Sequence, residues 1–470
     1  MKQIAATLWR RRVCLAYVLI CALATGCSRV REKRPGHAPR SVLLVTTAAL
    51  RKDHLSAYMY ARPTSAWPAT EEERRQLRAM SLDDLAGQGV LFADATSNGP
   101  RTFPALCALM TGTRAAVPAD PAEDRALEHE ATTLAERFRD AGFRTAAFTS
   151  GVWLREARGL DQGFDPWTYR ASDAVAIDQA RQWIEQAELD PARPWFVWVH
   201  LAGCDPPYDP RGAPPLPGDA PGVLDFSRLY SDPKYKGPAD GSVAYLAKLE
   251  RGEVQADDSD RARIVDLYDG EVARVAASVR TLVLSLRNVG RDGSRWRQTL
   301  FVFAGLHGVE LGEGAPPARG STQLTANVVS MPLLFLHPGS LTGSRVLAEQ
   351  VGIEDVAPTI CEWFGLPALS ARERALSGRS LLPVMDSYKK FEFEHRPAYA
   401  ELSGPNPTRS LRTREFALLE TTQAGATKLA LFDRSADPEE RFDIASTRPD
   451  LCAKLHAELE RAAFGAVRTP

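Results

Sequence analysis

Residues 299–314 read TLFVFAGLHGVELGEG and place polar side chains in a glycine-rich loop behind a short apolar run. The run is rich in β-forming residues and predicts a buried strand. His307 and Glu310 lie in the loop, where an α/β protein commonly binds its ligand. Imidazole and carboxylate groups can bind a metal ion or move a proton there. The neighbouring Leu306 can do neither, so the loop has only part of the chemistry that its position favours.

A second run, PWFVWVHL, predicts a strand that ends at His200 and leads into a Pro-rich turn with Asp205 and Asp209. Such turns favour Asp for backbone reasons, and this is the interpretation that we favour for both residues. For His307 we favour a hydrogen-bonded polar residue over a metal ligand. Whether His200 faces a pocket stays open.

The chemical alternative is a rebuilt site made of His200, Asp205, His307 and Glu310. Its nitrogen and oxygen donors suit zinc better than calcium. Against it, Glu310 and Glu313 are expected to be solvent-exposed.

The first predicted strand, SVLLVT, is followed by ALRKDHL. We expect Asp53 and His54 to fix this loop. Four scattered cysteines, Cys107, Cys204, Cys361 and Cys452, form no CxxC motif and are expected to be small buried residues.

The bulk composition is that of a soluble globular protein. The chain has 470 residues, 44% hydrophobic and 25% charged, with 58 basic and 59 acidic side chains. This length suits one large domain and a smaller one. The near-zero net charge gives no argument for a nucleic-acid partner.

Residues 1–26 have basic residues, a short apolar core and small residues, and predict a secretory signal. The sequence LATGC resembles a bacterial lipobox, which implies cleavage before Cys27 and a lipid on its thiol. Residues 27–40 then form a basic tether. Ser28, rather than Asp, favours an outer-membrane location in the cell envelope. The alternatives are an ordinary signal peptide or an uncleaved anchor.

Buried strands alternate with amphipathic helices from residue 41 to about residue 385. This order predicts an α/β domain, residues 41–385, with helices on both faces of a sheet. Residues 386–470 predict a small antiparallel sheet with a packed C-terminal helix.

The order of ten segments resembles the sulfatase family of the alkaline phosphatase superfamily. They are SVLLVTTAALRKDHLSAYMY, TSNGPRTFPALCALMTG, GFRTAAFTSG, GLDQGFDPW, HLAGCDPPYDP, LYDGEVARV, TLFVFAGLHGVELGEG, MPLLFLHPG, VGIEDVAPTICEWFGLP and SGRSLLPV. The resemblance implies a large mixed sheet between helices, followed by a small C-terminal sheet domain.

The resemblance also implies a divalent cation, usually calcium, bound by acidic residues after two strands. A Cys or Ser oxidised to formylglycine attacks the sulfate ester. The cation neutralises the charge of the ester and activates the nucleophile.

This chain departs from the family at these positions. Ala48 and Ala49 replace the first acidic pair, and Leu306 replaces the later Asp. Thr102 stands at the nucleophile position, and Leu106 replaces the arginine of the motif.

Two further departures follow the predicted strand PWFVWVHL. Gly203 and Asp205 stand there at positions that are commonly Asp and His in the family. Arg319 is the candidate for an expected lysine. Threonine cannot become formylglycine, and no base is evident beside Thr102. We therefore interpret Thr102 as a structural turn residue.

The leading hypothesis is a lipid-anchored pseudo-sulfatase without a cofactor, with a binding or scaffolding role and an anionic or glycan ligand. The rival is an active sulfuric- or phosphoric-ester hydrolase or transferase that uses Thr102 or a rearranged metal site. A third is an envelope protein without a pocket function. The protein partner is not predicted.

Overall fold

The computed structural model contains two sheets within the part of the chain that it describes. The described residues are 39–66, 80–114, 116–118, 120, 124–188, 190, 192–208, 225–288, 294–313, 323–341, 343–369, 377–385 and 394–466.

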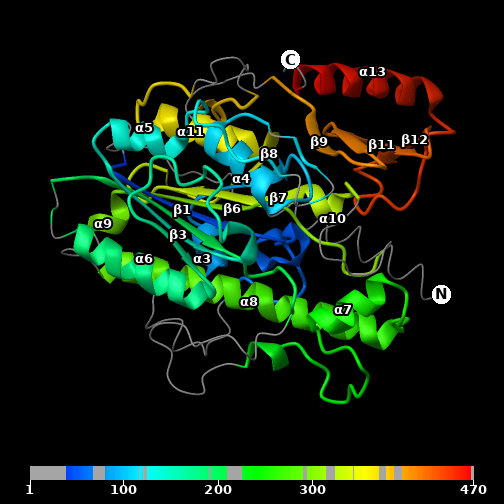
Figure 1. The fold of residues 1–470 in the computed structure, drawn as a ribbon, viewed down its shortest axis with the longest axis horizontal. Coiled ribbons are helices and arrows are strands. Elements are labelled where there is room, and N and C mark those ends of the chain that lie inside the picture. The colour runs from blue at the N-terminus through cyan, green and yellow to red at the C-terminus, as the bar shows by residue number, and fades with distance from the viewer. Residues whose placement is uncertain are drawn as a thin grey trace, which may run out of the picture. The chain divides into compact units, whose positions relative to one another are not determined.

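The larger sheet has eight strands in the order β4-β3-β5-β1-β6-β7-β2-β8 (Figure 1). β1 pairs in parallel with β5 and β6, whereas β7 is antiparallel to both β6 and β2. The predicted α/β class with a large mixed sheet is therefore confirmed. The strands are β1 (Ser41–Thr47), β2 (Val90–Thr96), β3 (Arg144–Ser150), β4 (Trp167–Arg170), β5 (Trp195–Leu201), β6 (Thr299–Gly305), β7 (Ser330–Leu336) and β8 (Arg345–Gly352).

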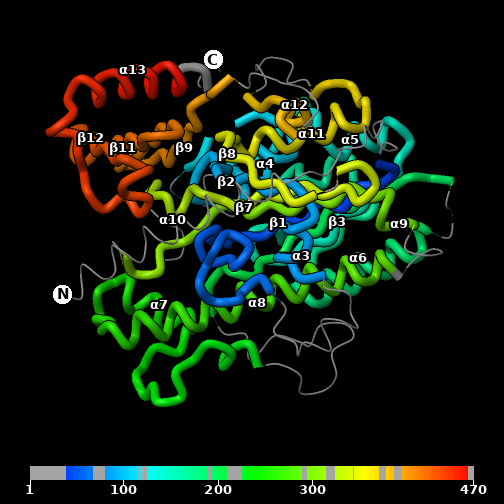
Figure 2. The backbone as a smooth tube through the Cα atoms, turned by 180° about the vertical axis from the view of Figure 1, so that it is seen from behind, coloured from blue at the N-terminus to red at the C-terminus, as the bar shows by residue number. Residues whose placement is uncertain are grey.

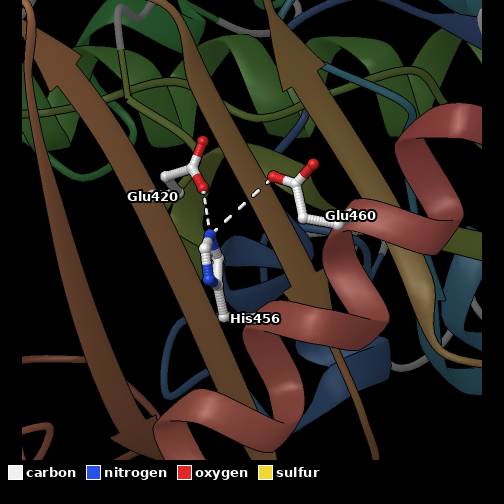
Figure 3. A group of neighbouring side chains, drawn as sticks. All are labelled: Glu420, His456 and Glu460. Carbon is white, nitrogen blue, oxygen red and sulfur yellow. Dashed lines mark hydrogen bonds and ion pairs between the residues drawn. The ribbon is translucent and has the colours of Figure 1, made fainter.

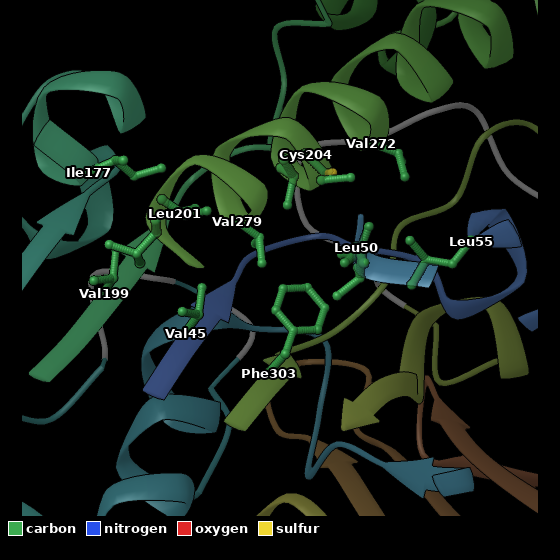
Figure 4. Close-up of a cluster of buried hydrophobic side chains, with 14 of the residues drawn as sticks. Val45, Leu50, Leu55, Ile177, Val199, Leu201, Cys204, Val272, Val279 and Phe303 are labelled. Carbon is green, nitrogen blue, oxygen red and sulfur yellow. The ribbon is translucent and has the colours of Figure 1, made fainter. Parts of the chain in front are cut away.

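Alternate side chains of β1 enter two separate apolar clusters, as the period of a strand requires. Leu43 and Val45 pack with α6 (Asp173–Ala187) and α8 (Asp258–Asn288) on one face. Figure 4 shows Val45 in this cluster, together with side chains of both helices. Val42 and Leu44 join the cluster on the other face.

The second face is covered by α4, α5 and α11 (Figure 1). The remaining helices are shorter than α8. In chain order the helices besides α6 and α8 are α3 (Leu82–Ala86), α4 (Thr102–Thr111), α5 (Leu134–Asp140), α7 (Val243–Glu250), α9 (Ser294–Arg297), α10 (Ala326–Val329), α11 (Val356–Trp363), α12 (Leu382–Met385) and α13 (Pro449–Ala466).

The smaller sheet has four antiparallel strands in the order β12-β11-β10-β9, and α13 packs on it. β9 contacts β8 and β2 of the larger sheet, and Figure 2 shows these three strands close together. The predicted C-terminal sheet with a packed helix is confirmed. Its strands are β9 (Ala398–Leu402), β10 (Thr408–Arg412), β11 (Phe416–Gln423) and β12 (Ala426–Asp433).

Thr102 begins a helix rather than a turn, which corrects the sequence interpretation. α4 starts at this residue and all ten of its residues are buried. Pro104 is tolerated because the first turn of a helix needs no amide donor.

Within the described residues, no helix has both the length and the apolar character needed to cross a membrane.

Candidate functional site

Aliphatic side chains fill the positions where the resemblance places the metal ligands. Ala48 and Ala49 follow β1 and are 0% and 2% exposed, and Leu306 follows β6 and is 0% exposed. Leu106 of α4 is also 0% exposed and lies in the same apolar cluster as Leu306. The ends of β1 and β6 are thus closed by hydrocarbon.

Backbone hydrogen bonds hold these residues in place. The amide of Ala48 donates to the carbonyl oxygen of Leu201 at 3.1 Å, and the amide of Leu306 donates to that of Thr47 at 2.9 Å. The parallel pairing of β1 with β5 and β6 therefore continues past the strand ends. The backbone at these strand ends is regular, but the side chains of Ala48, Ala49 and Leu306 have no atom that can bind a metal ion.

Thr102 and His307 form a direct hydrogen bond across the loop, with 3.0 Å between the threonine Oγ1 and the histidine Nε2. The other ring nitrogen, Nδ1, lies 2.8 Å from the carbonyl oxygen of Gly308. A carbonyl only accepts, so Nδ1 carries the hydrogen and Nε2 accepts from the threonine hydroxyl. The expectation that Thr102 has no base beside it is therefore wrong.

Burial lowers the pKa of His307 to about 4, and the positive charge of Arg101 contributes to this shift. The imidazole is therefore neutral at pH 7. Arg101 is itself engaged, since its guanidinium donates to Asp124 at 2.8 Å and to the carbonyl oxygen of Pro118 at 2.9 Å. The pair of Thr102 and His307 thus has a hydrogen-bond acceptor for the hydroxyl, but the base is a weak one.

His200 is 1% exposed. Its Nδ1 lies 2.9 Å from Thr46 Oγ1, which accepts a hydrogen bond from the indole of Trp198 at 2.9 Å. The Thr46 hydroxyl thus bridges the indole of Trp198 and the imidazole of His200. Burial lowers the pKa of His200 to about 3, so this imidazole is also neutral. The sequence left open whether His200 faces a pocket. In the structure it is buried and forms a hydrogen bond with a side chain.

The four residues of the alternative zinc site form no ligand group in the structure. Among the described residues, one group of His, Cys, Asp and Glu side chains has its ligand atoms within 4.8 Å of one another, and none of the four belongs to it. That group is Glu420, His456 and Glu460.

Glu420 of β11 and two residues of α13, His456 and Glu460, point toward one another (Figure 3). The imidazole Nε2 lies 2.8 Å from the Glu420 carboxylate. Arg409 of β10 forms ion pairs with both carboxylates, at 2.5 Å to Glu420. This guanidinium offsets one of the two carboxylate charges, and the ion pairs of the group join α13 to the small sheet.

Glu310 is buried, which contradicts the expectation that it is solvated, whereas Glu313 is exposed as expected. Glu310 is 3% exposed, accepts a hydrogen bond from the Thr325 hydroxyl at 2.6 Å, and has a pKa raised by burial. Glu313 forms an ion pair with the buried Arg51 at 2.5 Å. Both carboxylates therefore have side-chain partners within the fold. The glycine-rich sequence of the loop does not indicate these partners.

The loop after β1 is fixed by Asp53 and His54, as predicted. Asp53 forms an ion pair with Arg51 at 2.7 Å, and His54 Nδ1 lies 2.7 Å from the buried carboxylate of Asp269. The turn expected at Asp205 is also present, since its amide donates to the carbonyl oxygen of Ala202 at 2.8 Å.

Three predicted residues, Cys27, Asp209 and Arg319, lie outside the described residues. The four cysteines beyond the N-terminal segment are buried and free, as expected.

A model of the sulfatase family matches residues 40–366. The chain therefore belongs to the sulfatase family of the alkaline phosphatase superfamily. It is similar to arylsulfatase K of Homo sapiens, with 23% identity over 95% of this chain and 86% of the relative. Arylsulfatase K of Danio rerio is 23% identical over 78% of this chain and 75% of the relative.

Solved structures share the fold. A 2-O GAG sulfatase superposes with a TM-score of 0.67 at 16% identity, covering 92% of this chain and 93% of that one. A phosphonate monoester hydrolase of Agrobacterium radiobacter gives 0.64 at 17% identity, covering 92% and 96%.

Sulfatases use a divalent metal ion, typically calcium, which needs several oxygen ligands. Ala48, Ala49 and Leu306 offer none, and all three are buried. The residues at these positions do not fit the ion.

Proposed function

We propose that this protein is a non-catalytic member of the sulfatase family that binds a ligand. The observation that carries the proposal is the burial of Ala48, Ala49, Leu106 and Leu306 in apolar packing at the positions expected for ligands and arginine. The ends of β1 and β6 lack the expected metal-binding carboxylates, and α4 lacks the expected arginine. The combined loss goes beyond a change of substrate specificity.

The chemistry explains why the replacement matters. A sulfate ester repels a nucleophile, and the cation and arginine of a sulfatase remove this barrier. Without them, an attack by Thr102 would build up charge against Leu106 and Leu306, where desolvation makes charge costly.

Turnover and metal content test this proposal together. The detergent-solubilised protein is incubated with calcium, magnesium, manganese or zinc, desalted and measured by elemental analysis. It is then assayed with 4-nitrophenyl sulfate and 4-nitrophenyl phosphate beside Thr102→Ala. We expect less than stoichiometric metal and equal background rates. Turnover that Thr102→Ala abolishes would disprove the loss of catalysis.

The hydrogen bond between Thr102 and His307 favours a second candidate, a metal-independent ester hydrolase or transferase. In it, Thr102 Oγ1 attacks the sulfur or phosphorus atom of the ester while His307 Nε2 takes the hydroxyl proton. The ester S–O or P–O bond breaks, and the leaving alcohol receives that proton from His307. This candidate predicts turnover in EDTA that survives in Thr102→Ser and disappears in both Thr102→Ala and His307→Gln. Equal rates in all four proteins would exclude it.

We also propose a lipid anchor at Cys27 in the bacterial cell envelope, with the outer membrane as its location, because residues 1–28 carry the lipobox pattern. The ligand that we propose is a sulfated glycan. Among the structures of similar fold are a 2-O GAG sulfatase and an enzyme in complex with a neocarrahexaose.

A further inference from the structure

A cavity of about 620 Å³ lies where the larger sheet meets the C-terminal sheet. Gln350 of β8 and Arg114, just beyond α4, line it from the first. Leu411 of β10 and Arg461 of α13 line it from the second. Figure 1 shows β8, β9 and α13 in this region. The volume is within the range of about 300–1,000 Å³ that is usual for sites of small molecules.

The cavity is separate from the positions of the sulfatase site. β8 is the edge strand, three strands from β6 in the sheet. At about 4.8 Å for each strand, this amounts to roughly 14 Å. Thr102 begins α4 whereas Arg114 lies beyond its end, and ten helical residues span about 15 Å. Neither Thr102, His200 nor His307 lines the cavity.

Two donors in the cavity wall have no acceptor among the residues that the structure describes. One is the amide Nε2 of Gln350, a residue that is only 5% exposed. The other is Arg114 Nε, and its carboxylate neighbour, Glu354, is 3.9 Å away. Stacking on the ring of Tyr399, at 5.0 Å, holds the Arg114 guanidinium in place. An unpaired buried donor costs about 1–3 kcal/mol, so both suit oxygen atoms of a ligand.

The wall also has an excess of positive charge, with four arginines against two glutamates. Arg396 is neutralised by Asp355 at 2.7 Å. Arg414 and Arg461 are exposed, and within the described part of the chain they have no ion-pair partner. Two guanidinium groups without partners are suited to an oxyanion, which they can bind through paired hydrogen bonds.

We propose that this cavity binds a small organic anion. Arg414 and Arg461 hold its carboxylate or sulfate group, and Gln350 and Arg114 donate to neutral oxygens deeper in the cavity. Leu411 supplies an apolar wall for the carbon skeleton.

The inference gives the binding role proposed above a location. Its failure would leave the proposed loss of catalysis intact, because turnover and metal content test that loss separately.

The test is isothermal titration of the full-length, detergent-solubilised protein with three sugars: D-glucuronate, D-glucose 6-sulfate and neutral D-glucose. We expect one or both anions to bind and glucose to bind at least about tenfold more weakly. The two anions distinguish a carboxylate site from a sulfate site, and either result supports the proposal. Binding of neither anion, or equal binding of glucose, would overturn it.

Charge reversal on α13 provides matched variants. Arg461→Glu removes a cation from the cavity, whereas Lys454→Glu makes the same change at an exposed position of the same helix outside it. We expect Arg461→Glu to weaken anion binding by about tenfold or more and Lys454→Glu to change it less than about twofold. Equal affinities in the two variants would contradict the assignment.

Gln350→Leu tests the deeper part of the cavity. Because the amide nitrogen has no partner, its loss should leave the urea midpoint unchanged or raised. We expect the same variant to weaken anion binding by about fivefold or more. Unchanged affinity would exclude Gln350 from the site.

Discussion

At the scale of single residues, Leu306 bears on whether the ends of β1 and β6 can bind a metal ion. It stands where the resemblance places a metal-binding carboxylate, and it is fully buried in a cluster with Leu106. A carboxylate returned to this one position would meet neither a second acidic ligand at Ala48 nor one at Ala49.

We therefore expect Leu306→Asp to lower the free energy of unfolding by about 4 kcal/mol, because it buries a carboxylate in hydrocarbon and removes packing. Leu306→Met, which keeps the volume, should cost less than about 1.5 kcal/mol. Urea unfolding measures both. Added calcium should not restore Leu306→Asp, and recovery by calcium would show that ligands for the ion remain.

His307 predicts a pH dependence of stability. Its pKa is about 4 in the folded protein and about 6.5 in an unfolded chain. Between these values the unfolded state binds more protons, so stability is present above pH 6.5 and is lost as the pH falls toward 4.

From pH 7 to pH 5, one such histidine accounts for a loss of about 2 kcal/mol. His307→Gln keeps an acceptor for Thr102 but cannot titrate, so we expect its urea midpoint to fall less over this interval. His200 shifts in the same direction and remains in both proteins. Parallel pH profiles for the wild type and His307→Gln would contradict the assigned ionisation.

At the scale of elements, a buried ion pair joins β10 to the loop between β12 and α13, and both of its side chains also form hydrogen bonds to the backbone at the start of α10. Arg412 and Glu440 have side chains 1% and 3% exposed and form two hydrogen bonds, of 2.6 and 2.8 Å. Arg412 also donates to the carbonyl oxygen of Leu324, and Glu440 accepts from the amide of Ala326.

Glu440→Gln leaves a buried guanidinium without its counter-charge, and we expect it to destabilise the fold by about 3 kcal/mol. Glu253→Gln is the control, because Glu253 pairs with Arg251 on the surface and its loss should leave the midpoint unchanged. Equal midpoints for the two variants in thermal unfolding would show that the buried pair contributes no more than the exposed one.

The sequence predicted elements well wherever one face alone is apolar. The sequence of residues 173–187 predicts a helix and that of residues 426–433 predicts a strand, and α6 and β12 have these bounds in the structure. α4 was missed because all its residues are buried, and a continuous apolar run lacks the helical period. β8 was missed because its exposed edge does not alternate polar and apolar residues.

In the candidate site, too, the sequence indicates some features and not others. The substitutions at the metal positions could be named from the order of motifs, because that order follows the strands. The bond between Thr102 and His307 joins residues 205 positions apart, and no local pattern indicates such a contact.

At the scale of the whole molecule, the protein has the sulfatase fold, and the positions where the resemblance places the metal ligands carry no charged side chain. Arginines gather at the cavity beside the C-terminal sheet, and alanine and leucine occupy the strand ends of the old site. The larger sheet is stabilised by the two apolar clusters on its faces, which need no metal ion. Ligand binding at the cavity beside the C-terminal sheet would therefore require no change of fold.

The proposed anchor would set where that binding occurs. A bacterial lipoprotein carries several acyl chains on its N-terminal cysteine, and more than one chain is needed for stable membrane attachment. We expect cells fed labelled palmitate to label the wild type, which should partition into the detergent phase of Triton X-114. Cys27→Ser should lose the label, whereas Cys21→Ser, six residues earlier in the signal segment, should keep it. Label that persists in Cys27→Ser would place the lipid elsewhere, and an unlabelled wild type would leave residues 1–26 as an ordinary secretory signal or an uncleaved anchor.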